Sequence, residues 1–250
     1  MSADAVIDVR DLVQRIGTQE ILRGFSIPVI RGETLVLLGK SGGGKSVFLR
    51  HLIGLMKPIS GQIFVEGEDI TKFGERELEP VRRKVGMVFQ DGALFDSMTV
   101  FENVAFPLRE RGERNETTIS RKVADTLALV NMAGHDKKMP VNLSGGMRKR
   151  VALARAIVSP PEVILYDEPT AGLDPIVSDS INRLIRRMQR QLHATSIVVT
   201  HDMVSCNHIA DRVALLHEGR VYFYGTTEDL KQTQDPIIRD FVDGRSNEAD

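Results

Sequence analysis

The fold of this chain is decided by the stretch TLVLLGKSGGGKSVFLRHLI at residues 34–53. Within it, residues 39–46 fit the pattern G-x-x-x-x-G-K-[ST], which marks a phosphate-binding loop. The apolar run 34–38 before the loop predicts a buried strand, and the apolar spacing of 47–53 after it predicts a helix. Strand, loop and helix in this order are the context in which such a loop binds phosphate; the alternative is a glycine-rich turn that binds nothing.

The residue types in this loop suit an anion. Glycines let the backbone curl so that successive N–H groups point at one phosphate, and the following helix N-terminus adds partial positive charge. We expect Lys45 to reach the outer phosphates of a nucleotide and the Ser46 hydroxyl to ligate Mg²⁺. The predicted ATP-binding residues here are Gly39, Lys40, Ser41, Gly42, Gly43, Gly44, Lys45 and Ser46.

Composition and charge indicate an ordinary globular protein. Of its 250 residues, 42% are hydrophobic and 27% charged, and 33 basic against 34 acidic residues leave a net charge of −1. That balance gives no general argument for nucleic acid or anionic lipid as a partner. The single cysteine, Cys206, predicts a reducing compartment; we interpret it as a small apolar filler, with a catalytic thiol as the alternative. We expect neither a signal peptide nor a membrane-spanning helix.

Strand and helix patterns alternate along the chain, which predicts an α/β fold with a parallel sheet. Alternating apolar residues in the first thirty positions predict antiparallel strands at one edge of the core. Further strands are expected at 61–67, 84–89, 163–166 and 196–199, with a hairpin at 213–216 and 220–224. Helices are expected at 100–109, 119–131, 147–158 and 175–193, the last with Pro175 at its first position.

We interpret residues 1–250 as a single domain with a helical insertion. Residues 1–90 and 161–235 are expected to form the α/β core, and 91–160 the helical subdomain. Residues 236–250 are expected to be a C-terminal tail, of which the polar segment 246–250 frays.

A second motif follows the expected strand 163–166 and consists of two acids, Asp167 and Glu168. A carboxylate at a strand tip beside a phosphate loop can hold Mg²⁺, directly or through water. The adjacent acid can orient and deprotonate an attacking water. Alone this pattern is weak, but together with the phosphate loop it predicts nucleotide hydrolysis.

With these motifs and four others, the chain resembles the ATP-binding cassette ATPases. The family's signature sequence stands at 143–147 as LSGGM, where the family usually ends in glutamine. The remaining matches are Gln90 after a strand, DEPT at 167–170, AGLDP at 171–175 and His201-Asp202 after a buried strand. The resemblance covers residues from about 6 to 230. It implies a RecA-like P-loop core with an N-terminal antiparallel β-subdomain and an inserted α-helical subdomain.

The family pairs two cassettes head to tail around two ATP molecules, so the resemblance implies a second copy of this chain as a partner. Ser144, Gly145 and Gly146 of one copy would close over the γ-phosphate held by the other. Ser144 is expected to cap the helix beginning near Gly145, so that its hydroxyl and the helix N-terminus face the anion.

The resemblance also assigns roles to single residues. Glu168 would be the general base, His201 would bridge to the γ-phosphate and Asp174 would communicate across the dimer. Gln90 would sense Mg²⁺ and the attacking water, and Asp167 would be a metal partner. The implied catalytic residues are therefore Glu168, His201 and Gln90, and the implied Mg²⁺ residues are Ser46, Gln90 and Asp167.

Two positions depart from the family pattern. Ile16 precedes Gly17 where many members have an aromatic side chain that stacks on adenine, so only apolar contact is expected there, with Arg15 as an alternative stacking group. Met147 replaces the glutamine of the signature and cannot hydrogen-bond through an amide.

A narrower resemblance lies in FQDGALFDSMTVFENVAFPLR at 89–109, which is similar to the ATPase of phospholipid-trafficking transporters, the Mla or Mce-associated systems of outer-membrane lipid asymmetry. LSGGM at 143–147 and DPIIRDFVDG at 235–244 fit the same group. This implies a peripheral protein on the cytoplasmic face of the inner membrane. The implied partners are an MlaE-like integral permease, an MlaD-like Mce-domain lipid-binding protein and, in some systems, a small STAS-type accessory subunit; no nucleic acid is expected.

An apolar cluster lies beside Gln90 and is suited to an adaptable contact with a permease helix; the alternative is that it belongs to the core. Its members are Ala93, Leu94, Phe95, Met98, Val100 and Phe101. Basic residues also gather at 82–84, at 148–150 and along the helix 183–190, and we interpret the last group as a solvated face.

The leading interpretation is the energising subunit of a phospholipid transporter. The same chemistry would serve a cassette for another substrate, such as an amino acid or an organic solvent. A soluble cassette protein acting on ribosomes or DNA is a second alternative, although the chain has neither tandem cassettes nor a long coiled-coil insertion. A small-molecule or nucleotide kinase is a third, against which LSGGM and His201 argue.

Overall fold

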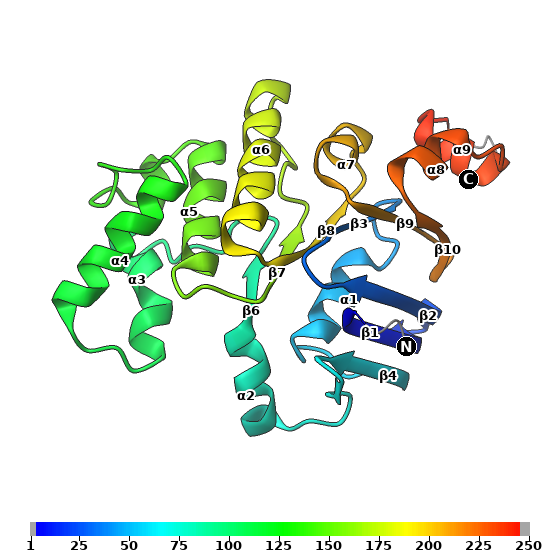
Figure 1. The fold of residues 1–250 in the computed structure, drawn as a ribbon, viewed down its shortest axis with the longest axis horizontal. Helices are drawn as coiled ribbons and strands as arrows, with labels where there is room; N and C mark the ends of the chain where they lie inside the picture. Colours follow the sequence, from blue (N-terminus) through cyan, green and yellow to red (C-terminus); the bar gives the residue numbers. More distant parts are fainter. Residues whose placement is uncertain (1–3, 246–250) are drawn as a thin grey trace. The chain divides into compact units, whose positions relative to one another are not determined.

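A computed structural model describes residues 4–245, and its internal contacts divide the chain into two compact units. The first unit contains residues 4–82 and 195–245, and the second contains residues 83–194. Figure 1 labels the elements of both. The segment 246–250, which we expected to fray, lies outside the described residues.

The first unit contains an antiparallel sheet with strand order β2-β1-β4-β5. Its strands are β1 (Ala5–Ile16), β2 (Gln19–Ile30), β4 (Ser60–Val65) and the short β5 (Glu68–Asp69). Apolar side chains such as Val9, Leu12 and Phe25 are fully buried in it. The antiparallel N-terminal strands expected from the alternating sequence are thus confirmed.

The same unit also holds parallel strands. β3 (Thr34–Gly39) pairs in parallel with β8 (Thr195–Thr200) on one side and with β9 (Arg212–His217) on the other. β10 (Arg220–Gly225) pairs antiparallel with β9 and forms the expected hairpin. Every residue of β3 and β8 is buried, as in parallel strands that are covered on both faces.

Helices of the first unit include some that the sequence did not predict. α1 (Lys45–Leu52) follows the phosphate loop as expected. α7 (Met203–Ile209), α8 (Thr227–Gln232) and α9 (Pro236–Val242) were not predicted, and neither was α2 (Glu75–Lys84), which spans the boundary between the units in the chain. α9 lies in the segment that we expected to be a tail. The Asp235 carboxylate caps it by accepting from Ile237 N and Ile238 N, and the Ile238 side chain is buried.

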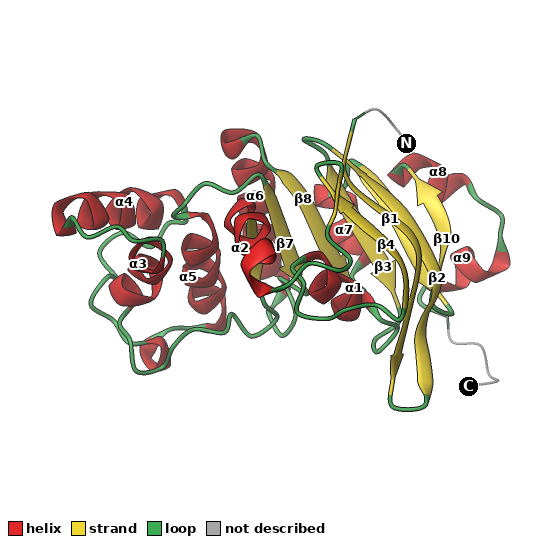
Figure 2. Cartoon of the chain, turned by 90° about the horizontal axis from the view of Figure 1, so that it is seen from below, coloured by secondary structure: helices red, strands yellow, loops and turns green. Residues whose placement is uncertain are grey.

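The second unit combines one parallel strand pair with helices. β6 (Val85–Val88) pairs with β7 (Val163–Asp167). The helices α3 (Val100–Glu110), α4 (Glu116–Leu129), α5 (Gly145–Ile157) and α6 (Pro175–Leu192) confirm those expected, and α3 packs against both α4 and α5 (Figure 2). Each begins after a residue whose side chain caps it: Thr99, Asn115, Ser144 and Asp174. Pro175 occupies the predicted first position of α6.

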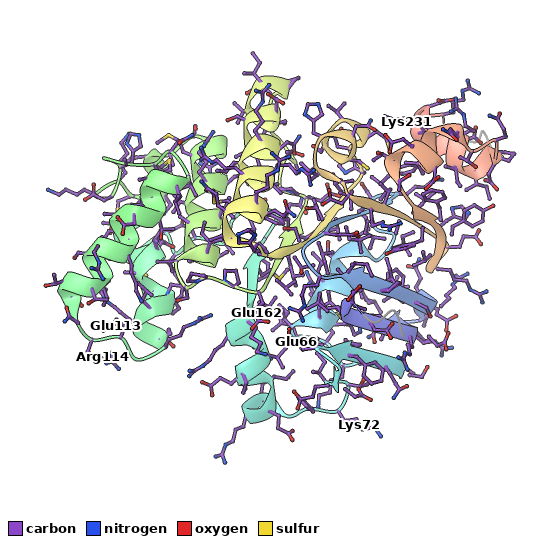
Figure 3. All side chains as sticks on the ribbon, in the orientation of Figure 1. Glu66, Lys72, Glu113, Arg114, Glu162 and Lys231 are labelled. Atoms are coloured by element: carbon purple, nitrogen blue, oxygen red, sulfur yellow. The ribbon has the colours of Figure 1, made fainter. Side chains whose placement is uncertain are left out.

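The turn between α3 and α4 is held by a side chain. A Glu113 carboxylate oxygen accepts from Arg114 N and Asn115 N, both at 2.9 Å (Figure 3). This turn carries the chain to Asn115, the cap of α4. Among residues 4–245, the helices are all too short or too polar to cross a bilayer.

Candidate functional site

The predicted phosphate loop joins β3 to α1: Gly39 ends the strand, residues 40–44 form the turn, and Lys45 and Ser46 begin the helix. α1 begins after Gly44, whose backbone is left-handed with φ of 102°. A Cβ at this position would lie 2.8 Å from Cγ2 of Ile21. Only glycine therefore fits without strain, and it leaves the start of the helix free of a capping side chain.

The Lys45 side chain is held within this loop. It is only 5% exposed, and its Nζ donates to Gly39 O at 2.8 Å and to Lys40 O at 3.0 Å. The ammonium is thus buried against the loop that surrounds it, while Ser41 and Gly42 on the outer turn are exposed. A cation fixed within a glycine-rich loop at the start of a helix suits the outer phosphates of a nucleotide.

His201 leaves the same edge of the sheet as the phosphate loop. β3 and β8 run parallel with Leu38 opposite Thr200, so the chain departs into both loops at this edge. The His201 side chain is exposed. The next residue, Asp202, caps α7 by accepting from Val204 N at 2.9 Å and Ser205 N at 3.1 Å, which fixes the backbone just after the histidine.

The second unit brings Gln90, Asp167 and Glu168 to one edge of its strand pair. β6 and β7 run parallel with Val88 opposite Tyr166, so Gln90 after β6 lies at the same edge as Asp167, which ends β7, and Glu168, which follows it. Gln90 is exposed, whereas Asp167 and Glu168 are 6% and 8% exposed. Glu168 adopts a left-handed backbone with φ of 45°, a conformation that strains a residue with a side chain and occurs preferentially at functional sites.

Lys149 is the residue of this region that the sequence did not identify. Its side chain, on α5, is buried, and its Nζ donates to Gln90 O and, at 3.2 Å, to Glu168 O. Burial lowers the pKa of the ammonium, and the negative charges of Asp91, Asp167 and Glu168 oppose that shift. In the sequence Lys149 was one member of a basic run, which gave no sign of burial.

The signature segment has the predicted cap. Ser144 is exposed and extended, and its Oγ accepts from Met147 N at 3.3 Å. Gly145 and Gly146 form the first turn of α5; a Cβ at Gly146 would lie 2.6 Å from Cγ1 of Val177, so the glycine permits close packing against α6. Asp174 caps α6 by accepting from Ile176 N and Val177 N, both at 3.0 Å.

The donor chemistry at these positions fits Mg²⁺ with ATP. Magnesium is usually held by one or two protein oxygens together with phosphate oxygens and water, and Ser46 and Asp167 supply a hydroxyl and a carboxylate of this kind. Within residues 4–245 no group of three or more His, Cys, Asp and Glu side chains forms a metal site by itself. The protein oxygens therefore suit a metal that arrives with its nucleotide.

The structure also describes two positions discussed from the sequence, Ile16 and Cys206. Ile16 is 50% exposed at the end of β1, and the neighbouring Arg15 forms an ion pair with Glu20 at 3.6 Å. Cys206 is fully buried, and burial raises the pKa of its thiol to about 12, in line with its interpretation as a small apolar filler.

The apolar cluster beside Gln90 is only partly core. Val100 is fully buried, whereas Ala93 is exposed and Phe95 is 41% exposed. The alternative that all six residues are core is therefore wrong. On α6, the Arg183 side chain is 79% exposed and pairs with Asp179 at 2.8 Å, in line with a solvated face.

Residues 22–171 match the model of the ABC transporter family. The chain therefore belongs to this family, and it is an ATP-hydrolysing subunit of an ABC transporter. A solved structure of similar fold is cbiO1 of Clostridium perfringens, part of the cbiONQ transporter complex, with a TM-score of 0.84, 31% identity and coverage of 95% of this chain and 94% of that one. The expected ABC nucleotide-binding fold is confirmed.

Particular relatives carry different names. The chain is 42% identical over 239 residues to the probable ribonucleotide transport ATP-binding protein mkl of Mycobacterium tuberculosis, covering 96% of this chain and 67% of the relative. It is 40% identical over 242 residues to the intermembrane phospholipid transport ATP-binding protein MlaF of Haemophilus influenzae, covering 97% and 92%. It is 41% identical over 220 residues to the methionine import protein MetN of Mesorhizobium japonicum, covering 88% and 60%.

Proposed function

We propose that this chain energises phospholipid trafficking, as the ATP-binding subunit of an Mla-type transporter on the cytoplasmic face of the inner membrane. The observation that carries the proposal is the match with MlaF, which extends over 97% of this chain and 92% of that protein. The segment 89–109, on which the resemblance to lipid systems first rested, adds a partly exposed apolar face next to Gln90.

In this proposal the first unit captures ATP. The main-chain N–H groups of 39–46 bind the phosphates, and the Lys45 ammonium moves from the loop carbonyls to the outer phosphates. Ser46, Asp167 and Gln90 are the residues that would hold Mg²⁺, which would supply positive charge to the phosphate oxygens. His201, at the same sheet edge as the loop, donates to a γ-phosphate oxygen.

Glu168 performs the proton transfer. As general base it accepts a proton from the water that attacks the γ-phosphate, while Gln90 orients that water. The buried main chain at the end of β7 holds the Glu168 backbone in its left-handed conformation and so limits where the carboxylate can point. A general base of this kind contributes on the order of 10²–10⁴-fold to the rate.

Each site is completed by a second copy of the chain. A hydroxyl has one proton to donate and two lone pairs. Ser144 Oγ uses one lone pair to accept from Met147 N, and its proton is left to donate to the γ-phosphate held by the partner. Gly145 and Gly146, in the first turn of α5, would close over the same phosphate with the helix N-terminus.

The shared site has a direct test. After Cys206→Ala, one pool of chains carries Ser41→Cys and the other Ser144→Cys, and the two pools are mixed with ATP and Mg²⁺. We expect an intersubunit disulfide that depends on ATP, because both positions are exposed and would meet across one nucleotide. If no crosslink forms while single chains hydrolyse ATP at full rate at high dilution, the shared-site proposal is wrong.

The permease and the transported molecule are tested together. The chain is purified from membranes with its partners, and co-purifying proteins and lipids are identified by mass spectrometry. We expect an integral permease, an Mce-domain protein, in some preparations a STAS-type subunit, and bound phospholipid. ATP hydrolysis by the complex is then measured with phospholipid, with L-methionine and with a ribonucleotide, and we expect only phospholipid to change the rate.

Methionine import is the second candidate, because MetN is 41% identical over 220 residues. A methionine importer would contain a permease without an Mce-domain protein, and its rate of ATP hydrolysis would respond to L-methionine. A complex with that composition and response would overturn the lipid proposal and leave the ATPase assignment intact.

A further inference from the structure

The signature helix α5 holds the segment after β6 through cationic side chains. Lys149 Nζ donates to the carbonyl of Gln90, and the Arg155 guanidinium donates to the carbonyls of Ala93 at 2.7 Å and Gly92 at 2.8 Å. A Cβ added at Gly92 would lie 3.4 Å from the Cβ of Ala152, so the segment passes close to the helix at this point. The backbone of 90–93 is thus fixed to α5 at both ends.

Lys149 differs from Arg155 because it reaches a second strand end. The same Nζ donates at 3.2 Å to the carbonyl of Glu168, which also accepts from Ala171 N at 3.2 Å. That carbonyl belongs to the residue whose φ is +45°. A buried ammonium that binds two main-chain oxygens fixes their separation, since moving either one would leave a charged donor short of an acceptor in the interior.

We propose that Lys149 is a positioning residue of the ATPase, which ties the backbone of Gln90 to the backbone of Glu168 and so sets both side chains from one point on the signature helix. The inference rests on the proposed roles of Gln90 and Glu168. In this role Lys149 acts through two main-chain carbonyls and not on the nucleotide. It acts by keeping the two reacting groups in register, and small displacements of such groups lower rates strongly.

The donor chemistry of Lys149 supports this placement, because its buried side chain donates to two main-chain carbonyls. A neutral residue of the same length would keep the packing but would leave both carbonyls without this donor. The geometry therefore points to the hydrogen bonds, rather than to the volume of the side chain, as the reason for a lysine here.

Lys149→Met within the transporter complex is the main test, because methionine nearly matches lysine in length and donates no hydrogen bond. We expect kcat for ATP hydrolysis to fall by about tenfold to a hundredfold, with KM for ATP unchanged, because the phosphate loop is untouched. Lys149→Arg retains a cationic donor and is expected to recover a substantial part of kcat.

Arg150→Met is the matched control. Arg150 lies next to Lys149 on α5, is partly buried and also binds two partners, Val130 O and Ser180 Oγ, but neither strand end. The Arg150→Met substitution should lower the unfolding midpoint without lowering kcat of the folded protein. If Lys149→Met retains wild-type kcat, if it loses no more kcat than Arg150→Met, or if Lys149→Arg is as slow as Lys149→Met, the inference is wrong.

Two further measurements keep the test decisive. If Lys149→Met does not fold, the comparison of Lys149→Arg with wild type decides, because a purely structural lysine predicts a shifted midpoint with unchanged kcat. Glu168→Gln in the same complex separates this inference from the proposed function. Normal hydrolysis by Glu168→Gln would overturn the site assignment itself, whereas a slow Glu168→Gln with a wild-type Lys149→Met would overturn only the positioning role.

Discussion

The two glycine-rich turns proposed to face ATP, 39–46 in the first unit and 143–147 in the second, begin their helices in different ways. α1 starts after Gly44, whose left-handed backbone brings no capping side chain. α5 starts after Ser144, whose extended backbone and hydroxyl give an ordinary N-cap, with Oγ 3.3 Å from Met147 N. The first turn offers an anion main-chain N–H groups and a buried ammonium; the second offers a hydroxyl and a helix end.

This difference teaches which turn depends on a glycine for its backbone conformation, since Gly146 of the second turn serves close packing against α6 instead. The phosphate loop needs the absent Cβ of Gly44 for its shape, since any side chain there meets Ile21. The signature turn has its own cap and forms an ordinary helix start without a ligand. Substitutions in the signature turn should therefore weaken its action on ATP more than they lower the stability of the fold.

The largest effect is expected at Lys45. Lys45→Ala should abolish turnover and weaken ATP binding by about 1.5–3 kcal/mol for each charge-assisted hydrogen bond lost. Phosphate release and calorimetric titration with ATP measure the two effects. Lys57→Ala, at an exposed lysine beyond α1, is the control and should behave as wild type. ATP hydrolysis at the wild-type rate by Lys45→Ala in its complex would show that residues 39–46 are not the ATP-binding loop.

Glu168→Gln leaves both turns intact and so separates capture from hydrolysis. Turnover should fall by about 10²–10⁴-fold, because the amide cannot accept the proton. ATP-bound dimers should accumulate, and sedimentation with ATP and Mg²⁺ detects them. A mutant that stays monomeric and hydrolyses ATP normally would show that Glu168 is not the base.

Matched alanines compare the backbones of the two turns. Gly44→Ala should lower the free energy of unfolding by about 1–3 kcal/mol, the cost of a strained left-handed residue. Gly145→Ala should change it by less than about 1 kcal/mol, because its added Cβ meets only Leu173 Cδ2 at 3.1 Å. Urea unfolding midpoints measure both, and equal losses would contradict the comparison.

The last comparison concerns the cap of the signature turn, Ser144. Ser144→Ala removes the cap and should cost about 1 kcal/mol. Ser144→Asp keeps a capping oxygen and adds a charge that suits a helix N-terminus, so it should fold as well as wild type. The same charge repels a phosphate, and hydrolysis should fall. An active Ser144→Asp protein would show that this turn does not approach the γ-phosphate.

Much of the fold could be predicted because its central strands are buried along their whole length. β3, β7 and β8 have no exposed residue, so their sequences are short apolar runs between turns. Helix α2 was not predicted because only Leu78 and Val81 are buried and Pro80 interrupts the helical pattern of apolar residues. Helix α9 was not predicted because one buried side chain, Ile238, gives no apolar periodicity.

The residues of the candidate site also fall into those that the sequence predicted and those that it did not. Residues that follow strands or cap helices were predicted because their motifs are local and their chemistry is fixed by residue type. Lys149 was not, because it acts on main-chain oxygens far away in sequence, and carbonyl groups carry no residue signature. Its neighbours Arg148 and Arg150 also donate to backbone carbonyls, those of Leu143 and Val130, so all three members of this basic run bind main-chain oxygens of their own unit.

The pairing of β3 has a consequence for synthesis on the ribosome. β3 is translated early, but both of its neighbours, β8 and β9, come from beyond residue 194. Until they emerge, an apolar strand has neither of its sheet partners, and such distant parallel pairings form slowly and expose the nascent chain to aggregation. A chain released at residue 194 would contain the complete phosphate-loop sequence and still lack the sheet that gives the loop its shape.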